Sequence, residues 1–105
     1  MPGVYTQTPL ADGQLPATVA ALFTATGVTL VKTIVVTNTG ALSITMNLYV
    51  NRGTRRRIFP KDLSLSAGAS AVFDSPFTLN SGESLDGDAS SATTIDYFVS
   101  GVLEV

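Results

Sequence analysis

The sequence predicts an all-β protein, a single antiparallel β-sandwich of about seven or eight strands with an extended N-terminal arm. Short segments with a two-residue apolar period recur along the chain, separated by Gly, Asn or Pro, and no segment combines a helical period with a capping pattern. The segments recur every 8–14 residues or so, which is typical of a sandwich or barrel. Jelly-roll and immunoglobulin-like Greek-key connections both fit, although the Cys, Trp and Cys of an immunoglobulin core are absent.

Residues 1–16 are the predicted arm, and residues 17–105 the predicted sandwich domain. The arm contains three of the five prolines and has no regular period. Because proline fixes φ and removes a backbone donor, such a segment either stays mobile or is ordered along a neighbouring surface. We therefore expect the arm to be frayed in an isolated domain and to contribute an interface through six residues: Pro2, Tyr5, Pro9, Leu10, Leu15 and Pro16.

The first half of the domain predicts two long strands joined by a hairpin at residues 38–40. Over residues 42–51 the alternation is unbroken, with Leu42, Ile44, Met46, Leu48 and Val50 on one face. In the upstream strand, over residues 28–37, we expect Val28, Leu30, Ile34 and Val36 on the inner face, with Lys32 interrupting that face near a sheet margin.

The second half predicts shorter strands. A brief strand runs from Arg55 to Phe59, and the form L-x-x-G-x-S at residues 65–70 and 79–84 indicates two tight turns. Residues 86–91 are predicted as a loop. The last strand, over residues 94–105, has apolar residues on both parities, which favours burial on both faces.

The composition excludes most familiar catalytic chemistry. With 105 residues and no His or Cys, the chain is one domain without a Ser-His-Asp or Cys-His system, a common zinc site or a disulfide, so we expect no enzyme activity and no cofactor. Only 13% of residues are charged, and a surface of low charge favours association. No signal peptide and no apolar stretch of membrane-spanning length is evident, so we expect synthesis in a cytoplasm and no membrane partner.

Five of the six basic residues fall within ten positions: Arg52, Arg55, Arg56, Arg57 and Lys61. On a strand, Arg55 and Arg57 point to one side and Arg56 to the other, which divides the cluster. The net charge of −2 and the lack of interleaved aromatic residues make nucleic acid an unlikely partner. A docking surface for an acidic partner is the favoured interpretation, and a solvated edge strand is the alternative.

Acidic residues dominate the chain after Lys61, and the predicted acidic loops carry Glu83, Asp86 and Asp88. These charges either pair with the arginines within one molecule or join one copy to the next, and the second case predicts salt-sensitive self-association. A calcium site is only weakly indicated, because the further ligands of an EF-hand do not follow. Tyr5, Tyr49 and Tyr97 offer sugar stacking, but cross-strand packing is the simpler interpretation.

Several turn-and-strand segments resemble small virion proteins of tailed bacteriophages. The likeness is carried by residues 48–53 (LYVNRG), 56–65 (RRIFPKDLSL) and 67–70 (AGAS), and it extends to residues 11–16, 82–85 and 97–105. These segments contain no catalytic or metal motif, so no functional residue is carried over. The resemblance implies a structural component of the phage particle, most similar to the small β-sandwich proteins that decorate or cement the capsid.

That resemblance gives specific expectations about partners and location. The protein is expected in the virion, made in the host bacterial cytoplasm, where it bridges capsomers of the major capsid protein. It is also expected to bind copies of itself as a homo-oligomer, with a trimer preferred because three-fold positions recur on icosahedral lattices. The alternative is a tail, fibre or baseplate accessory protein that binds a host surface or glycan.

Overall fold

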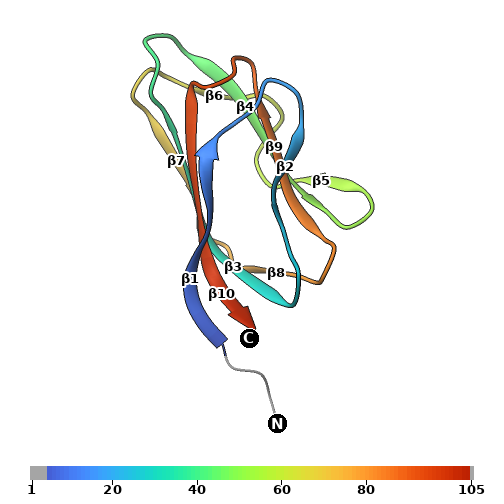
Figure 1. The fold of residues 1–105 in the computed structure, drawn as a ribbon. Coiled ribbons are helices and arrows are strands. Elements are labelled where there is room, and N and C mark those ends of the chain that lie inside the picture. The colour runs from blue at the N-terminus through green and yellow to red at the C-terminus, as the bar shows by residue number, and fades with distance from the viewer. Residues whose placement is uncertain (1–4, 105) are drawn as a thin grey trace.

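A computed structural model describes the backbone of residues 5–104 and the side chains of residues 9–103. Two antiparallel sheets pack face to face, which confirms the predicted sandwich, but the strands number ten and not seven or eight, five in each sheet (Figure 1). The first sheet contains β1 (Tyr5–Gln14), β3 (Thr29–Asn38), β7 (Ser70–Phe73), β8 (Phe77–Leu79) and β10 (Ile95–Glu104). The second sheet contains β2 (Ala20–Thr24), β4 (Ile44–Asn51), β5 (Arg55–Arg57), β6 (Leu63–Leu65) and β9 (Ser84–Ala89).

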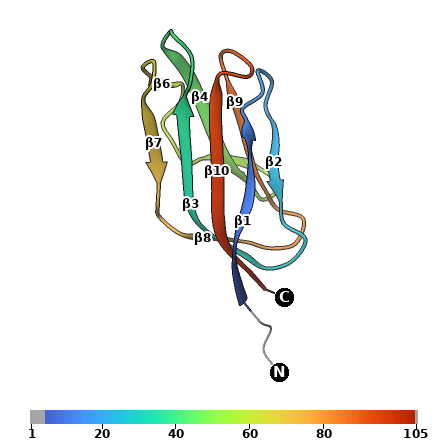
Figure 2. The same ribbon diagram turned by 60° about the vertical axis from the view of Figure 1, so that its left-hand side comes forward.

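The strand order identifies the connections as those of a jelly roll. The first sheet runs β1-β10-β3-β7, with β8 on the same edge of β3 as β7, and Figure 2 shows these strands side by side. The second sheet runs β2-β9-β4-β5, with β6 also paired to β4. When β5 and β6 count as one interrupted strand, and β7 and β8 as another, each sheet has four strands, and every connection crosses between the sheets except the β4–β5 hairpin. This order distinguishes the jelly roll from the immunoglobulin-like alternative.

The core lies between the sheets and is made by one face of each long strand. Met46 and Leu48 of β4 are fully buried, which confirms the predicted inner face of that strand, and Val99 of β10 packs into the same core. Leu42 is 75% exposed because β4 begins two residues later, at Ile44. Burying these side chains is the main favourable contribution to folding.

A β-bulge at Lys32 changes the face that β3 presents to the core. Ser100 pairs with Thr33 and Gly101 with Val31, so Lys32 is the additional residue. As a result Ile34 and Val31 are both fully buried, and the predicted inner position of Leu30 is wrong. The predicted inner position of Val28 is also wrong, since this side chain is 40% exposed. Lys32 interrupts the period, but it does so in a strand between two neighbours and not at a sheet margin.

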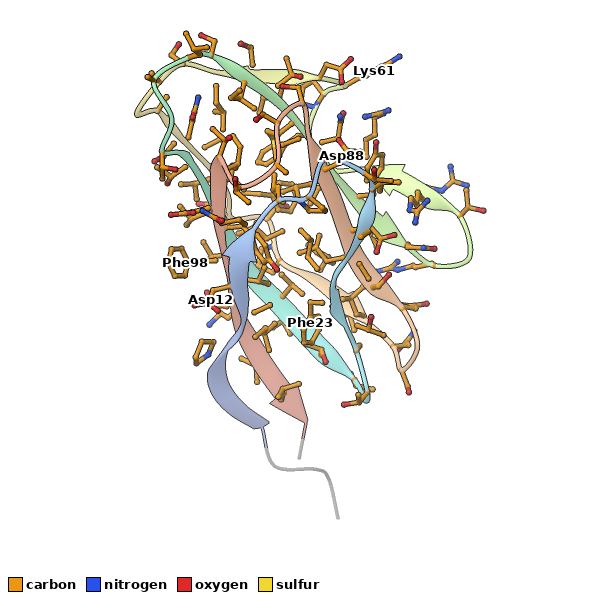
Figure 3. The ribbon with its side chains drawn as sticks, turned by 45° about the horizontal axis from the view of Figure 1, so that its top comes forward. Asp12, Phe23, Lys61, Asp88 and Phe98 are labelled. Carbon is orange, nitrogen blue, oxygen red and sulfur yellow. The ribbon has the colours of Figure 1, made fainter. Side chains whose placement is uncertain are left out.

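Two further expectations about the strands are corrected. The prediction that β10 is buried on both faces is wrong, because Phe98 is 58% exposed on the outside of the first sheet, beside Asp12 (Figure 3). Nothing in the described chain covers that outer face. Residues 84–89 form β9, so Asp86 and Asp88 lie in a strand between β2 and β4 and not in a loop.

The extended N-terminal arm is not confirmed. Residues 5–14 form β1, which pairs with β10 of the same chain along its whole length. Leu15 then turns into the core, where it is fully buried, and its backbone N–H donates to the carbonyl of Ile95 at 2.9 Å. Pro9 lies at a register shift in β1, where a residue without an N–H is tolerated. Pro2 and the side chain of Tyr5 lie outside the described part of the chain.

Candidate functional site at the arginine strand

The arginine cluster is built on the short hairpin of β4 and β5, which stands out from the side of the sandwich (Figure 1). Asn51 ends β4, and its side-chain carbonyl accepts the N–H of Gly53 at 3.0 Å. Gly53 has a φ of 95°, a conformation that a side chain disfavours, so glycine closes the turn. The chain then returns as β5, with Val50 opposite Arg56.

The alternation predicted for this strand is observed. Arg55 and Arg57 reach polar side chains on the outer face of the second sheet, whereas Arg56 lines a pocket on the opposite face. The cluster is therefore divided between two faces of the hairpin.

On the outer face, Arg55 and Asp86 form an ion pair across β4. Nε of Arg55 lies 2.7 Å from Oδ2 of Asp86, Asn51 donates to the same oxygen at 3.1 Å, and the Ser84 hydroxyl donates to Oδ1 at 2.6 Å. Burial by itself raises the pKa of the Asp86 carboxyl. The hydrogen bonds from Ser84, Arg55 and Asn51, together with the charge of Arg55, outweigh that effect and hold its pKa below the ordinary value.

A second polar network on this face is centred on Asn47. Its amide nitrogen donates to Asp88 at 2.9 Å and to Asp62 at 3.1 Å, and its carbonyl oxygen accepts the backbone N–H of Asp62 at 2.9 Å. Arg57 donates to the same carbonyl oxygen and lies over the ring of Tyr49, 5.0 Å from its centroid. Tyr49 is thus a cross-strand packing residue. Asp62 has a φ of 52°, and the two bonds from Asn47 hold its turn.

Arg52 links the two sheets at the end of the hairpin. Its Nε lies 3.4 Å from Oε1 of Glu83. One of its terminal nitrogens donates to the carbonyl of Thr78 in β8, a strand of the first sheet. Glu83 also accepts the N–H of Asn80 at 2.8 Å. Three of the predicted basic residues, Arg52, Arg55 and Arg57, therefore have polar or charged partners within the same molecule.

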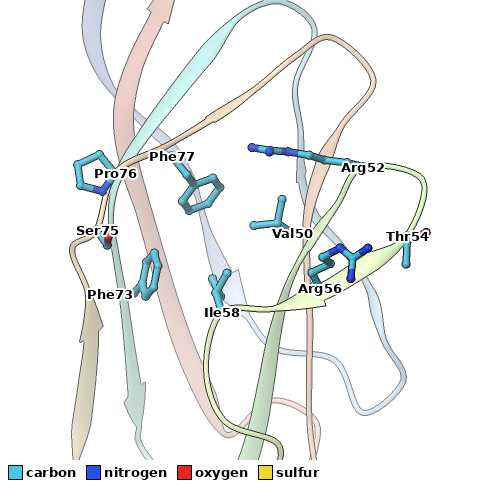
Figure 4. Close-up of a pocket in the computed structure, with 9 residues that line it drawn as sticks. All are labelled: Val50, Arg52, Thr54, Arg56, Ile58, Phe73, Ser75, Pro76 and Phe77. Atoms are coloured by element: carbon cyan, nitrogen blue, oxygen red, sulfur yellow. The ribbon is translucent and has the colours of Figure 1, made fainter.

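The inner face of the hairpin borders a pocket of about 420 Å³ between the edges of the two sheets. Figure 4 shows Arg52, Thr54 and Arg56 on the hairpin side and Phe73 and Phe77 on the other. The rings of Phe73 and Phe77 meet edge to face at 6.0 Å, and Phe73 meets Phe59 in the same way at 5.8 Å. The full lining is Val50, Arg52, Thr54, Arg56, Ile58, Phe73, Ser75, Pro76 and Phe77.

Two of the predicted basic residues are left without a partner. Within residues 9–103, Arg56 and Lys61 are exposed, and their side chains make no hydrogen bond, ion pair or ring contact. Lys61 lies at the same end of the molecule as Asp88 (Figure 3). These two cations are the part of the basic cluster that remains available to another molecule.

The predicted acidic residues have a different environment from the one expected. Asp86 is only 1% exposed, so it is not a surface group, and Glu83 is half-buried beside Arg52. Asp88 is held by Asn47. Two pairs between the basic and acidic halves thus form within one chain, which is the first of the two arrangements that the charge pattern allows.

The sequence did not indicate the pocket or the central position of Asn47. The pocket is made by residues from β4, β5 and the β7–β8 connection, which no local motif links. Among the described residues there is no cluster of three or more His, Cys, Asp or Glu side chains placed to hold a metal ion. The same part of the chain contains no helix that is long and apolar enough to cross a bilayer.

No family model and no curated protein matches this sequence. Solved structures nevertheless share its fold. A chain from the acid-stable capsid of Helicobacter pylori bacteriophage KHP30 matches with a TM-score of 0.57 and 14% identity, over 100% of this chain and 95% of its own. A chain from Bacillus endospore appendages, described as disulfide-linked pili, matches with a TM-score of 0.54 and 16% identity, over 95% and 87%.

A third match is to a chain of infectious bursal disease virus, Gx strain, with a TM-score of 0.52 and 15% identity. It covers 94% of this chain but only 32% of the viral one, so there the fold is one part of a longer chain. At these identities the likeness shows a shared fold. That fold occurs in chains from a phage capsid, a virus and a pilus.

Proposed function

We propose that this protein is a non-enzymatic structural component of a bacteriophage particle, which binds the capsid shell as a decoration or cement protein and bridges capsomers of the major capsid protein. The observation that carries the proposal is the match to a chain of a phage capsid over 100% of this chain and 95% of the other. The two chains are therefore of nearly equal length. A chain of this fold and of similar length therefore occurs in a phage capsid.

The physical properties of the chain support this role. A shell is strengthened when many copies of a small protein each add a modest contact, because the effect multiplies with the number of sites. Only 13% of the residues are charged, and a surface with few charges favours association with other protein surfaces. We expect a symmetric homo-oligomer, with a trimer preferred because of the three-fold positions of icosahedral shells.

The surface proposed to meet the shell is the β4–β5 hairpin together with the segment that follows β5. Arg56 and Lys61 are exposed there and have no partner within the described chain, so an acidic shell surface can bind them without breaking a contact in this protein. The six residues expected to form an arm have no separate role in this proposal, because β1 makes its hydrogen bonds within its own sheet.

Electron microscopy of labelled particles tests the proposal most directly. An antibody against this protein, applied to intact virions, should label the head at regular lattice positions. Purified protein should also sediment with assembled shells and not with free capsid subunits, since a bridging site exists only between capsomers. Absence of the protein from purified particles would contradict any virion role.

A second candidate, a fibre or tail accessory protein, is favoured by the match to the pilus chain, which covers 95% of this chain. This chain has no cysteine, so a fibre built from it is not disulfide-linked. Label confined to the tail or to fibres in the same microscopy experiment would favour this candidate over capsid decoration. A glycan array would then be the next measurement.

A further inference from the structure

We propose that the pocket beside β5 and the unpaired edge of β5 together bind an extended acidic segment of a partner protein, with a carboxylate at Arg56 and an apolar side chain in the pocket. The inference rests on the proposed function only for the identity of the partner, a protein of the capsid. The binding site itself is argued from this chain alone.

The pocket has the size and lining of a binding site. Its volume of about 420 Å³ falls within the range of roughly 300–1,000 Å³ that is typical of ligand pockets. Phe73, Phe77, Ile58 and Val50 supply apolar walls, and the edge-to-face contact of the two phenylalanines holds one wall rigid. Arg52 is fixed to Glu83 and Thr78, so it closes one end of the pocket as part of the wall.

Arg56 gives the pocket its preference for an acid. The other three arginines have partners in the molecule, whereas Arg56 has none among the described residues. It is exposed and borders the pocket beside Val50 and Ile58, so a carboxylate can reach it while an apolar neighbour enters the pocket (Figure 4). A charge-assisted hydrogen bond from a guanidinium to a carboxylate is stronger than a neutral one.

The free edge of β5 favours a peptide over other acidic ligands. The N–H of Ile58 donates to the carbonyl of Leu48 at 3.1 Å, so Arg56, two residues earlier, also has its backbone groups directed to β4. The backbone groups of Arg55 and Arg57 therefore point away from β4, and no strand of the described chain pairs with that edge. An incoming strand can satisfy these groups, whereas a fatty acid or a sugar gains little from them.

The register of the added strand predicts a simple recognition pattern. Side chains directly opposite one another on neighbouring strands lie on the same face. The partner residue opposite Arg56 therefore faces the pocket, and so does the residue two positions further, opposite Ile58. The first should be Asp or Glu and the second an aromatic or large aliphatic residue. An added strand that runs antiparallel to β5, as all pairs in this sheet do, meets Ile58 before Arg56, so its pattern is apolar-x-acidic from N- to C-terminus.

The test is an NMR titration of the ¹⁵N-labelled full chain with the blocked peptide acetyl-Thr-Thr-Phe-Thr-Glu-Thr-amide, which has the antiparallel order. We expect shifts of the amide signals of β5 and of residues 73–77, with a dissociation constant below about 1 mM. Arg56→Gln should raise that constant about tenfold. Lys61→Gln removes the same charge from an exposed residue outside the pocket and should change the constant less than about twofold.

Three results would overturn the proposal. The first is the absence of shifts in β5 and residues 73–77 at about 5 mM peptide, a concentration well above any useful affinity. The second is an equal loss of binding for Arg56→Gln and Lys61→Gln, which would show unspecific charge attraction. The third is tighter binding of octanoate than of the peptide at the same signals, which would assign the pocket to a small amphiphile. A peptide that binds while the protein fails to bind shells would contradict the proposed function alone.

Discussion

Nε of Arg55 lies 2.7 Å from Oδ2 of Asp86, and this contact joins the edge strand β5 to β9 across the intervening strand β4. Asp86 is almost completely buried, while the Arg55 side chain is 45% exposed. A buried carboxylate is costly unless hydrogen bonds and a charge compensate it, and here Ser84, Asn51 and Arg55 do so. The pair therefore makes the position of the arginine strand depend on the ionised state of Asp86.

The first prediction concerns the stability of the fold at low pH. Because the folded state holds the pKa of Asp86 below its ordinary value, the ionised carboxylate stabilises the fold above a pH of about 4, and this contribution is lost as pH falls through the folded pKa. Asp86→Asn should cost about 2 kcal/mol at pH 7 and flatten the fall in stability below pH 4. Urea unfolding between pH 7 and pH 3 measures both effects.

Asp74→Asn is the control for this experiment, because Asp74 is exposed and makes no hydrogen bond or ion pair within residues 9–103. The free energy of unfolding of this variant should change with pH in the same way as that of the original protein. If Asp86→Asn also kept this dependence on pH, the buried pair would not be a source of the acid sensitivity.

The second prediction concerns the bulge that sets the inner face of β3. A Cβ at Gly101 would lie 2.0 Å from the carbonyl oxygen of Leu30, so Gly101→Ala forces the two strands apart and should cost more than about 2 kcal/mol. A Cβ at Gly27 meets nothing within 4 Å, which makes Gly27→Ala the matched control. Thermal unfolding of the two variants compares them, and equal melting temperatures would contradict the prediction.

The third prediction concerns Asn38, which is fully buried at the end of β3. Its amide nitrogen donates to the carbonyls of Leu42 and Leu65 at 2.8 and 2.9 Å, and its carbonyl oxygen accepts the N–H of Gly40 at 2.9 Å. Asn38→Ala leaves these buried groups without partners and should cost about 3 kcal/mol. Asn80→Ala, at an exposed position, is the control in denaturant unfolding, and a similar cost for both would be the contrary outcome.

The sequence predicted the sandwich because the period of the strands is a local property. Met46 and Leu48 alternate with polar residues that face away from the core, and that pattern needs no knowledge of the neighbours. The inner face of β3 could not be predicted in the same way. It depends on the bulge at Lys32, which in turn depends on Gly101 in a strand some seventy positions later.

In the candidate site, too, local features could be predicted from the sequence and long-range contacts could not. The opposite orientation of Arg55 and Arg56 follows from strand geometry and was predicted. The partners of the arginines could not be predicted, because the ion pair of Arg55 with Asp86 requires β9 to lie next to β4. The proline-rich N-terminal segment also looked irregular in isolation, yet its residues 5–14 pair with β10.

The last prediction concerns binding to the shell. Arg56→Gln should weaken binding to assembled shells, measured by sedimentation, about tenfold, and Lys61→Gln about twofold. Arg56 borders the pocket, whereas Lys61 is an exposed charge outside it. Neither residue has a partner in the described chain, so both variants should keep the melting temperature of the original protein. Raising the salt concentration should weaken binding of the original protein more than binding of a variant that carries both substitutions.

Lys32→Gln separates a local contact from a general effect of net charge. Lys32 is half-buried in β3, on the other sheet, and its replacement changes the net charge by the same amount. Shell binding should therefore be unchanged in this variant. An equal loss for all three lysine and arginine variants would mean that the shell responds to overall charge, and the β4–β5 hairpin would then not be the surface that meets it.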